Sequence, residues 1–394
     1  MLVITVFIVE SLERFFFFRR VASSLKADMS FVFVTSEPLV FIKALAQGFS
    51  ARLVLSKKPI AGSVSCVDKA IEVLNGEFSR EQAQMTAQGL MKILNRLNQQ
   101  YGVAKVVCWN GQNILGLAAT DFSRECKIPT RFLELSNLPG KCFSDPLGVN
   151  AKSGLALNPA MLDDYADVNS VVHEKWVAIY KGSKKGALPQ AKLSNKGVKL
   201  LNYLLKFLYP AANHHSLKRF SKVASLLPGQ DYSVDDTGSL VDFVFYPMQV
   251  SSDTQIKLNS TVNNLDAIQS AYNKSVELGK SLVVKVHPAE VSQIEVDEML
   301  KMKATLSFFV SNENTIDLLE KSAQVVTINS TVGLEAMVLG KPVVVLGRAL
   351  YKDFDASRLK KYIHNFLVSD VDYFSNKKIE RQAALKLLGM EIVL

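Results

Sequence analysis

The sequence predicts an α/β protein with two parallel β-sheets and a helical segment between them. Short β-branched runs alternate with longer helical patterns over the first 135 residues, and the same alternation begins again at Val241. Residues 158–227, between these stretches, show no such alternation. Because strands that alternate with helices form βαβ units, we expect two Rossmann-like domains that face a central cleft, with a ligand bound there at the carboxyl ends of the strands.

The N-terminal domain is expected to span residues 1–157. Its first apolar run, Leu2–Val9, ends at Glu10 and follows no basic residue, so it is too short and wrongly flanked for a signal peptide or a membrane span. It should be the first strand. The next elements are predicted in this order: helix Ser11–Lys26, strand Phe31–Thr35, helix Pro38–Gly48, strand Arg52–Ser56, helix Ser79–Tyr101, strand Val103–Trp109, helix Ile114–Cys126 and strand Thr130–Leu135. The phenylalanine-rich run Arg14–Arg20 has two interpretations, a basic aromatic surface or the core face of the first helix.

Residues 158–240 are expected to form a helical, basic insert. Its segment 175–222 contains many lysines and no acidic residue, interleaved with leucine and aromatic side chains. This composition suits contact with an anionic inner-membrane surface, which we expect this segment to make. The alternative is an insert whose apolar face packs on the protein and whose lysines are solvated.

The C-terminal domain is expected over residues 241–372, and residues 373–394 should form a closing helix. Its elements are predicted in this order: strand Val241–Tyr246, helix Val262–Leu278, strand Ser281–His287, helix Ser292–Met302, strand Thr305–Val310, helix Thr315–Lys321, strand Gln324–Ile328, helix Leu334–Leu339 and strand Pro342–Leu346.

Composition narrows the class of protein. With 48% hydrophobic and 21% charged residues, the chain is typical of a soluble globular protein, and its net charge of +9 favours anionic partners. We do not expect nucleic acid, since the sequence has no groove-reading helix motif and no aromatic strand of the kind that binds RNA. The four cysteines lack CxxC spacing, so we expect no metal site and reduced thiols in a cytoplasmic protein: Cys66, Cys108, Cys126 and Cys142.

A candidate anion site follows the strand Gln324–Ile328. Asn329, Ser330 and Thr331 supply polar side chains and free N–H groups at the start of a helix, where a phosphate binds favourably. Glu335 follows one turn later, where a carboxylate can accept hydrogen bonds from sugar hydroxyls. The alternative is an ordinary capped helix between two parallel strands.

Two further candidates lie at the ends of strands in the C-terminal domain. Asp253 lies in the loop that follows the strand ending at Tyr246, and His287 lies at the tip of the next strand, which Pro288 ends. Each residue alone could be structural. Together, facing a predicted phosphate site, they form a candidate catalytic pair.

The N-terminal domain offers a comparable place. Glu134 is a carboxylate in an apolar strand end, which raises its pKa and suits a proton donor or shuttle; its alternative role is to brace the turn at Pro139 and Gly140. Four nearby residues are assigned to the acceptor side of the cleft, with a plain turn as the alternative for the first two: Trp109, Asn110, Asn137 and Asn150.

Taken together, these motifs resemble bacterial capsule-polysaccharide synthesis proteins, the retaining β-Kdo glycosyltransferases of capsule and O-antigen assembly. The resemblance spans both domains and rests on the ordered segments 249–253, 287–288, 329–348, Glu134 and 145–150. It does not extend to the basic insert.

The resemblance implies a GT-B-like architecture that uses CMP-Kdo as donor without a metal or other cofactor. Asp253 would attack the anomeric carbon, His287 would support the site and Glu134 would handle the proton, as retention by double displacement requires. The remaining predicted donor-binding residues are Gln249, Lys285, Asn329, Ser330, Thr331, Glu335 and Arg348. The acceptor would be a glycan or a glycolipid.

Two other functions stay open. A transferase of the same fold could use CMP-sialic acid or a UDP-sugar instead. A non-catalytic basic protein on the membrane periphery is the alternative from a different class.

Overall fold

The computed structural model describes residues 3–55, 67–136, 138–184, 201–202, 204–206 and 232–390. The chain divides into two compact units. The described residues of the first unit lie within 3–154, 201–206 and 366–390, and those of the second lie within 155–184 and 232–365. This division groups residues 155–184 with the second unit and the C-terminal segment with the first, whereas the sequence analysis separates both as an insert and a closing helix.

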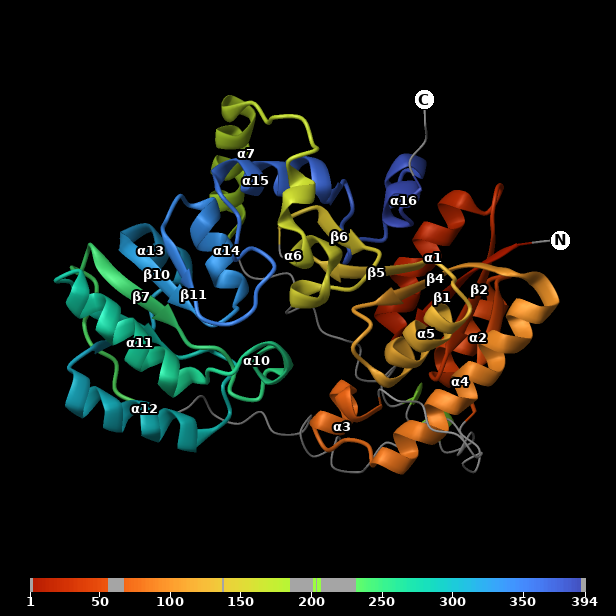
Figure 1. Ribbon diagram of the computed structural model, residues 1–394, viewed down its shortest axis with the longest axis horizontal. Helices are drawn as coiled ribbons and strands as arrows, with labels where there is room; N and C mark the ends of the chain where they lie inside the picture. Colours follow the sequence, from red (N-terminus) through yellow and green to blue (C-terminus); the bar gives the residue numbers. More distant parts are fainter. Residues whose placement is uncertain are drawn as a thin grey trace. The chain divides into compact units, whose positions relative to one another are not determined.

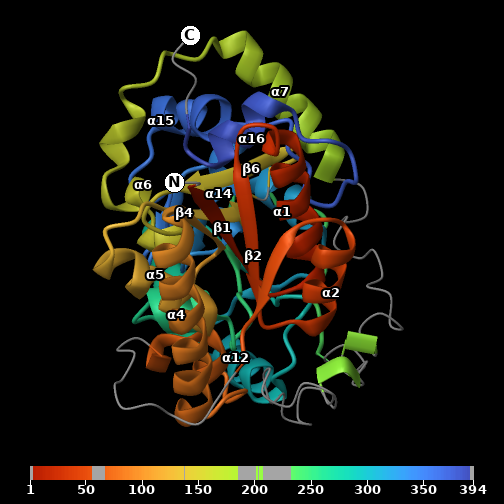
Figure 2. The same ribbon diagram turned by 90° about the vertical axis from the view of Figure 1, so that its right-hand side faces the viewer.

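The first unit contains a seven-stranded sheet in the order β12-β6-β5-β4-β1-β2-β3. Five of these strands are parallel and follow the doubly wound order of a Rossmann fold: β1 (Ile4–Val9), β2 (Ser30–Thr35), β3 (Ser50–Leu53), β4 (Val103–Trp109) and β5 (Thr130–Leu135). Helices α1 (Leu12–Leu25) and α2 (Pro38–Ala46) cover one face, and α4 (Arg80–Tyr101) and α5 (Ile114–Glu125) cover the other (Figure 2). The predicted Rossmann-like arrangement is confirmed for this unit.

The phenylalanine-rich run forms the core face of α1. Phe15, Phe17 and Phe18 are buried, and the six residues of β1 beneath them are buried as well. Arg20 is also buried, and its guanidinium donates to the carbonyl oxygens of Lys377 at 2.6 Å and Asp372 at 2.8 Å. The surface interpretation of this run is therefore wrong.

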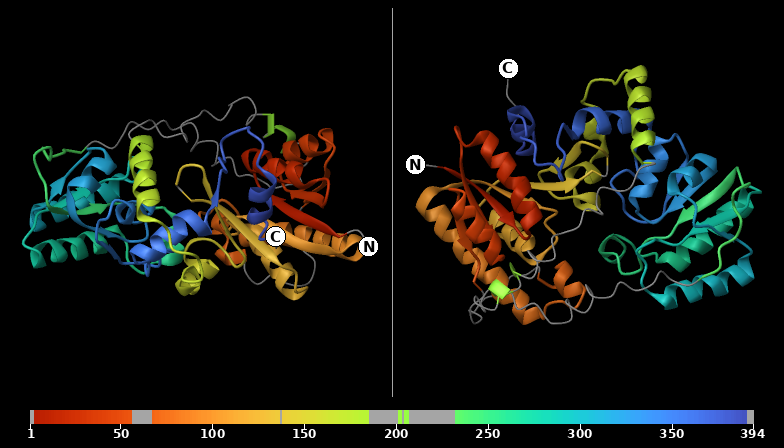
Figure 3. Two further views of the ribbon diagram at one scale, coloured as in Figure 1. Left: turned by 90° about the horizontal axis from the view of Figure 1, so that it is seen from above. Right: turned by 180° about the vertical axis from the view of Figure 1, so that it is seen from behind.

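The edge of this sheet departs from the expected parallel pattern. Strand β6 (Lys141–Asp145) pairs antiparallel with β5 through the turn at Pro139 and Gly140, where Gly140 has a φ of 65°. Strand β12 (Val368–Ser369) adds antiparallel to β6, and α16 (Arg381–Leu387) contacts α1 and β6 (Figure 3). The C-terminal segment thus completes the N-terminal sheet.

The second unit contains a parallel five-stranded sheet in the order β11-β10-β7-β8-β9. Its strands are β7 (Phe243–Pro247), β8 (Leu282–Lys285), β9 (Phe309–Val310), β10 (Ser322–Thr327) and β11 (Val343–Val345). Helices α11 (Asn264–Glu277) and α12 (Gln293–Leu306) pack on one face, and α13 (Thr315–Lys321) and α14 (Thr331–Val338) pack on the other (Figure 1). Counted along the unit, this strand order again matches a Rossmann fold.

Two local differences from the prediction have clear causes. The strand expected from Thr305 starts only at Phe309, because α12 continues to Leu306 and ends at Ser307 in the left-handed conformation, with a φ of 53°. The loop expected after β7 contains a short helix, α10 (Thr254–Asn259), which Asp253 caps.

The basic insert is only partly described. Helix α7 (Ser170–Lys184) belongs to the second unit, whereas residues 185–200, 203 and 207–231 lie outside the described residues. Three of the described lysines have acidic partners: Lys181 with Glu320 at 3.0 Å, Lys184 with Glu335 at 2.6 Å and Lys206 with Glu37 at 2.8 Å. Within the described ranges, no helix combines the length and the hydropathy that a membrane crossing requires.

Candidate functional site

The loops after β10, β7 and β8 carry most of the predicted donor-binding residues. These three strands are neighbours in the sheet and run parallel, so their carboxyl ends meet at one edge. The structure therefore places Asp253, His287 and Ser330 at the same edge of the second unit, although they are far apart in the sequence.

An amide network joins the first two of these loops. Gln249 Nε2 donates to Asn329 Oδ1 at 2.9 Å, and the backbone N–H of Asn329 donates to Gln249 Oε1 at 3.1 Å. Asn264 holds the backbone of Gln249 through both its N–H and its carbonyl, at 3.1 and 2.8 Å. Since Gln249 is buried, these bonds fix the distance between the β7 and β10 loops.

Asp253 and His287 lie close enough to influence each other electrostatically. Asp253 caps α10 by accepting the N–H of Gln255 at 2.8 Å, which leaves its second carboxylate oxygen outside this bond. His287 Nδ1 accepts the N–H of Ala289 at 3.0 Å, so the neutral ring carries its proton on Nε2. Burial lowers the pKa of His287, and the charges of Asp253 and Glu290 oppose that effect.

A buried carboxylate ties the β7 loop to the β8 loop. Glu290 accepts hydrogen bonds from the N–H of Ser251 at 2.6 Å and from its hydroxyl at 3.0 Å. It also accepts the N–H groups of Val291 and Ser292. Glu290 is not among the residues predicted from the sequence, although its place five residues after the end of β8 is a signal for a loop-bracing residue.

The start of α14 has the predicted capping arrangement. Ser330 is the N-cap, and its hydroxyl accepts the N–H of Val332 at 3.2 Å. Thr331 is exposed, and the hydroxyl of Tyr351 donates to the Ser330 carbonyl. An added Cβ on Gly333 would come within 2.3 Å of that hydroxyl, so only glycine permits this packing.

Three further predicted ligand-binding side chains also have partners within the protein. Glu335 is paired with Lys184, as described above. The Lys285 ammonium contacts the carbonyl of Glu313 and the hydroxyl of Thr315, the latter at 3.1 Å, and burial lowers its pKa. Arg348 donates to the Leu258 carbonyl at 2.9 Å. The sequence did not reveal these partners, because each comes from a different element.

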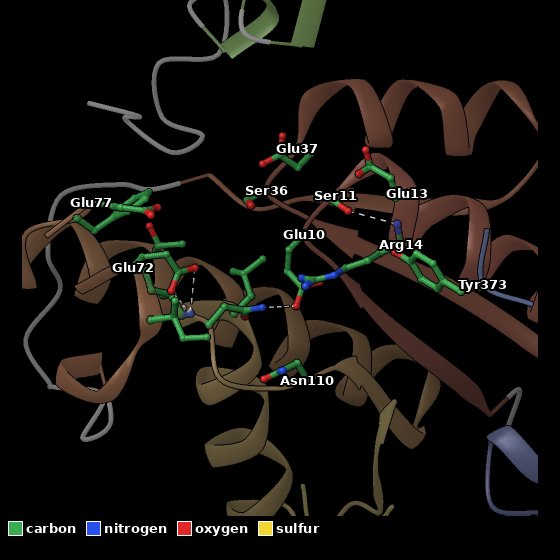
Figure 4. A pocket seen from close by; sticks show the side chains of 16 residues that line it. Glu10, Ser11, Glu13, Arg14, Ser36, Glu37, Glu72, Glu77, Asn110 and Tyr373 are labelled. Atoms are coloured by element: carbon green, nitrogen blue, oxygen red, sulfur yellow. Dashed lines mark hydrogen bonds and ion pairs between the residues drawn. The ribbon is translucent and has the colours of Figure 1, made fainter. Parts of the chain in front are cut away.

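The first unit contains a cavity of about 490 Å³ at the carboxyl ends of β1, β2 and β4. Strands β2 and β3 lie on one side of β1, and β4 and β5 lie on the other. Doubly wound folds bind ligands at this point, where the order of the strands reverses. Figure 4 shows Glu72 and Glu77 across from Arg14 and Tyr373, with Glu10 between them. The lining residues are Glu10, Ser11, Glu13, Arg14, Ser36, Glu37, Ile71, Glu72, Glu77, Phe78, Thr86, Asn110, Asn113, Ile114, Leu115 and Tyr373.

Of the predicted residues of the N-terminal domain that the structure describes, one lines this cavity. Asn110 does, and its amide donates to Glu134, which is largely buried behind it. Burial raises the pKa of Glu134, as expected, and the bond from Asn110 partly offsets that rise. Ser136, rather than Glu134, braces the following turn, because its hydroxyl accepts the N–H of Leu138 at 3.2 Å and donates to the Lys141 carbonyl at 2.8 Å.

The other predicted acceptor-side residues lie elsewhere. Trp109 belongs to the core and packs against Phe17 and Tyr373, with ring centroids 5.3 and 4.6 Å away, because the last residue of β4 points to the α1 face of the sheet. Asn150 begins a short 3-10 helix (Asn150–Lys152) after β6, has a φ of 52° and is not among the cavity residues. Asn137 lies outside the described residues.

Most residues that line the cavity were not predicted from the sequence. Glu10 follows directly on β1 and Glu37 lies two residues after β2, so their position at strand ends was a usable signal. Glu72 and Tyr373 come from a short helix and from the C-terminal segment, and nothing in the local sequence indicates that they meet. In the described part of the chain, no group of three or more histidine, cysteine or acidic side chains is arranged to hold a metal ion.

Comparisons with known proteins agree with the resemblance seen in the sequence. Residues 104–355 match the family described as capsule polysaccharide biosynthesis protein. The chain is 28% identical over 296 residues to Protein FixF of Sinorhizobium fredii, which covers 72% of this chain and 58% of FixF. It is 27% identical over 133 residues to the capsule polysaccharide export protein KpsS of Escherichia coli, which covers 31% of this chain and 34% of KpsS. The matches thus span less than two thirds of either relative.

Among solved structures, a similar one is the KpsC beta Kdo 2,7 transferase of Thermosulfurimonas dismutans, with 14% identity, a TM-score of 0.43 and 98% of each chain covered. The UDP-GlcNAc 2-epimerase of Methanocaldococcus jannaschii, in complex with UDP-GlcNAc and UDP, has 9% identity, a TM-score of 0.34 and 98% of each chain covered. The family match covers more than half of the sequence, and the chain therefore belongs to the capsule polysaccharide biosynthesis protein family.

Proposed function

We propose that this protein is a retaining glycosyltransferase that moves Kdo from CMP-Kdo to a glycan or glycolipid acceptor during synthesis of a bacterial surface polysaccharide. The observation that carries the proposal is the edge of the second sheet. A carboxylate, an imidazole and a hydroxyl-capped helix start follow three neighbouring strands there, and buried hydrogen bonds hold two of their loops together. Membership of the capsule polysaccharide biosynthesis family supports the same conclusion.

The proposed reaction has two displacements. Asp253 attacks the anomeric carbon of Kdo, the bond from that carbon to the phosphate oxygen breaks, and CMP leaves with the electron pair. Ser330, Thr331 and the N–H groups at the start of α14 would stabilise the departing phosphate, as helix N-termini do. An acceptor hydroxyl then attacks the sugar–aspartate ester, loses its proton to a base and frees Asp253.

Glu134 is the proposed base, from the resemblance to the family. The raised pKa of a buried carboxyl makes it a better proton acceptor than an exposed one, which suits this step. His287, as a neutral imidazole with its proton on Nε2, would donate a hydrogen bond in the donor site. The mechanism requires no metal ion or cofactor.

The donor can be tested by thermal shift. A ligand that binds only the native state raises its melting temperature, so CMP should stabilise the protein more than UDP or GDP at equal concentration. Stabilisation by UDP without an effect of CMP would favour a UDP-sugar transferase and remove the Kdo assignment. Comparison of CMP-Kdo with CMP-sialic acid as donors would separate the remaining two sugars.

The decisive experiment is a transfer assay. The protein is incubated with CMP-Kdo and a panel of acceptors that are neutral glycans, Kdo-terminated glycans or lipids, and products are identified by mass spectrometry. The protein is analysed in the same way for a covalent Kdo adduct on Asp253. Retention requires a β-linked product, and an α-linked product would contradict the proposed mechanism.

We also propose peripheral attachment to the cytoplasmic face of the inner membrane. In helix α7, Lys175 lies beside the exposed apolar residues Val171, Val172 and Ile179, which is a composition that suits a lipid headgroup layer. Flotation with anionic liposomes should show binding that weakens with salt and with Lys175→Gln. Binding indifferent to both changes would leave this helix as a purely structural element.

A further inference from the structure

The cavity of the first unit presents mostly hydrogen-bond acceptors. Among the described residues that line it, five are glutamates and one, Arg14, is a cation. In addition, Asn110 Oδ1 is fully buried at the cavity and has no hydrogen-bond partner among the described residues. A buried acceptor without a partner among the described residues and a set of carboxylates together favour a ligand that is rich in hydrogen-bond donors.

Two of the helix starts at the cavity, those of α1 and α5, are occupied by carboxylates of the protein itself. Glu72 accepts the N–H of Ile114 at 3.1 Å, so its carboxylate occupies the positive end of α5. Glu10 and Glu13 lie at the start of α1, where Glu10 pairs with Arg14 at 2.9 Å. In a doubly wound fold these are the positions that hold a phosphate, and here carboxylates stand in their place.

Two cations that contact lining glutamates are likewise paired. Arg14 is bound to Glu10, and Lys206 lies 2.8 Å from Glu37. No free positive charge therefore remains in the described lining to receive a carboxylate or a phosphate. Tyr373 and Phe78 add flat apolar surfaces to this acceptor-rich wall.

From these observations we propose that the cavity binds a sugar ring that carries hydroxyl donors and no acidic group, and that it rejects carboxylated and phosphorylated rings. If the proposed transferase function holds, this ring is the acceptor, which excludes a Kdo-terminated acceptor from this cavity. A volume of about 490 Å³ is ample for one such ring and its neighbour.

The test is direct ligand binding, without any donor. Saturation-transfer NMR at pH 8 compares methyl glycosides of galactose, glucose and rhamnose with methyl galactosiduronate, which differs from the galactoside chiefly by one carboxylate. At least one neutral glycoside should bind, and the galactosiduronate should bind at least about tenfold more weakly than the galactoside, because like charges repel in a partly buried site. Equal or tighter binding of the galactosiduronate, or no binding by any neutral glycoside, would overturn the proposal.

Two further measurements test whether the charge of the cavity glutamates causes the preference for the galactoside over the galactosiduronate. The double variant Glu13→Gln/Glu77→Gln should narrow the difference between galactoside and galactosiduronate, whereas Glu125→Gln, an exposed glutamate at the far end of α5, should leave it unchanged. In the unmodified protein the difference should shrink between about 0.05 and 0.5 M salt, since salt screens charge repulsion. If neither the double variant nor salt alters the difference in affinity between the two glycosides, charge repulsion does not cause the selectivity. Because no donor is present, these results are independent of whether CMP-Kdo transfer is observed.

Discussion

Gln249 and Asn329 form a reciprocal amide pair between the loops that follow β7 and β10: Gln249 Nε2 donates to Asn329 Oδ1, and the Asn329 N–H donates to Gln249 Oε1. The two residues are separated by 80 positions in the sequence. Their pairing holds the start of α14 beside the loop that carries Asp253, so it should matter for stability and for nucleotide binding alike.

We expect Gln249→Ala to lower the free energy of unfolding by about 1–3 kcal/mol, because it leaves Asn329 Oδ1 and the Asn329 backbone N–H without their partner. A double-mutant cycle with Asn329→Ala should give a coupling energy of about 0.5–3 kcal/mol. The exposed pair Gln269 and Asn273 on α11, at 3.0 Å, is the matched control and should couple by no more than about 0.5 kcal/mol. Chemical denaturation measures both cycles, and equal coupling in the two pairs would contradict a special role for the first.

Asp253→Asn should abolish transfer and leave the fold intact. Asparagine caps a helix about as well as aspartate, so the bond to the Gln255 N–H can persist while the carboxylate nucleophile is lost. Asp253→Ala should lose activity too, and in addition about 1 kcal/mol of stability. Transfer assays and melting curves on both variants, with the exposed Asp297→Asn as control, separate these effects. Full turnover in Asp253→Asn would exclude Asp253 as the nucleophile.

The sequence was most informative where local pattern decides the structure. The strands Val103–Trp109 and Thr130–Leu135 and the helix Thr315–Lys321 occupy the predicted ranges, because their hydrophobic periodicity and flanking turns depend only on neighbouring residues. The positions of Asp253, His287 and Ser330 at strand ends could be predicted for the same reason.

The sequence was least informative where distant segments meet. Strand β12 has two residues and pairs with β6 more than 200 positions away, so no local pattern marks it. The same holds for the partners of Lys285 and Glu335, and for Tyr373 in the cavity of the first unit. Side-chain partners across elements depend on tertiary packing, which periodicity alone does not reveal.

Glu72 should make stability depend on pH. Burial, together with the charges of Glu10 and Glu77, raises its pKa from 4.5 to about 7, so the native state binds this proton more tightly than the unfolded chain. Stability therefore falls as pH rises from about 4.5 to 7, by an amount on the order of 3 kcal/mol at most. In Glu72→Gln this loss is absent, and the amide oxygen can still accept the Ile114 N–H.

The measurement is the difference in melting temperature between Glu72→Gln and the unmodified protein. This difference should be more positive at pH 8 than at pH 5, whereas Glu125→Gln, which removes an exposed carboxyl of the same unit, should show no such trend. A difference that is constant with pH would mean that Glu72 titrates normally in the native state.

Substitutions in the ion pair between Lys184 and Glu335 can distinguish a structural role of Glu335 from a role in binding the ribose. Their side chains are only 18% and 11% exposed, so Lys184→Met should destabilise the second unit by about 1–3 kcal/mol. Lys181→Met should destabilise it less, because the ion pair of Lys181 with Glu320 is more exposed. If Glu335 also binds the ribose, Glu335→Gln should weaken CMP binding at least about tenfold. Lys184→Met should not weaken it, because the carboxylate of Glu335 stays available to the sugar hydroxyls. Calorimetric titration with CMP measures this contrast. Equal CMP affinity in all three proteins would make Glu335 a structural partner of α7 and leave nucleotide recognition to Ser330, Thr331 and the amide pair.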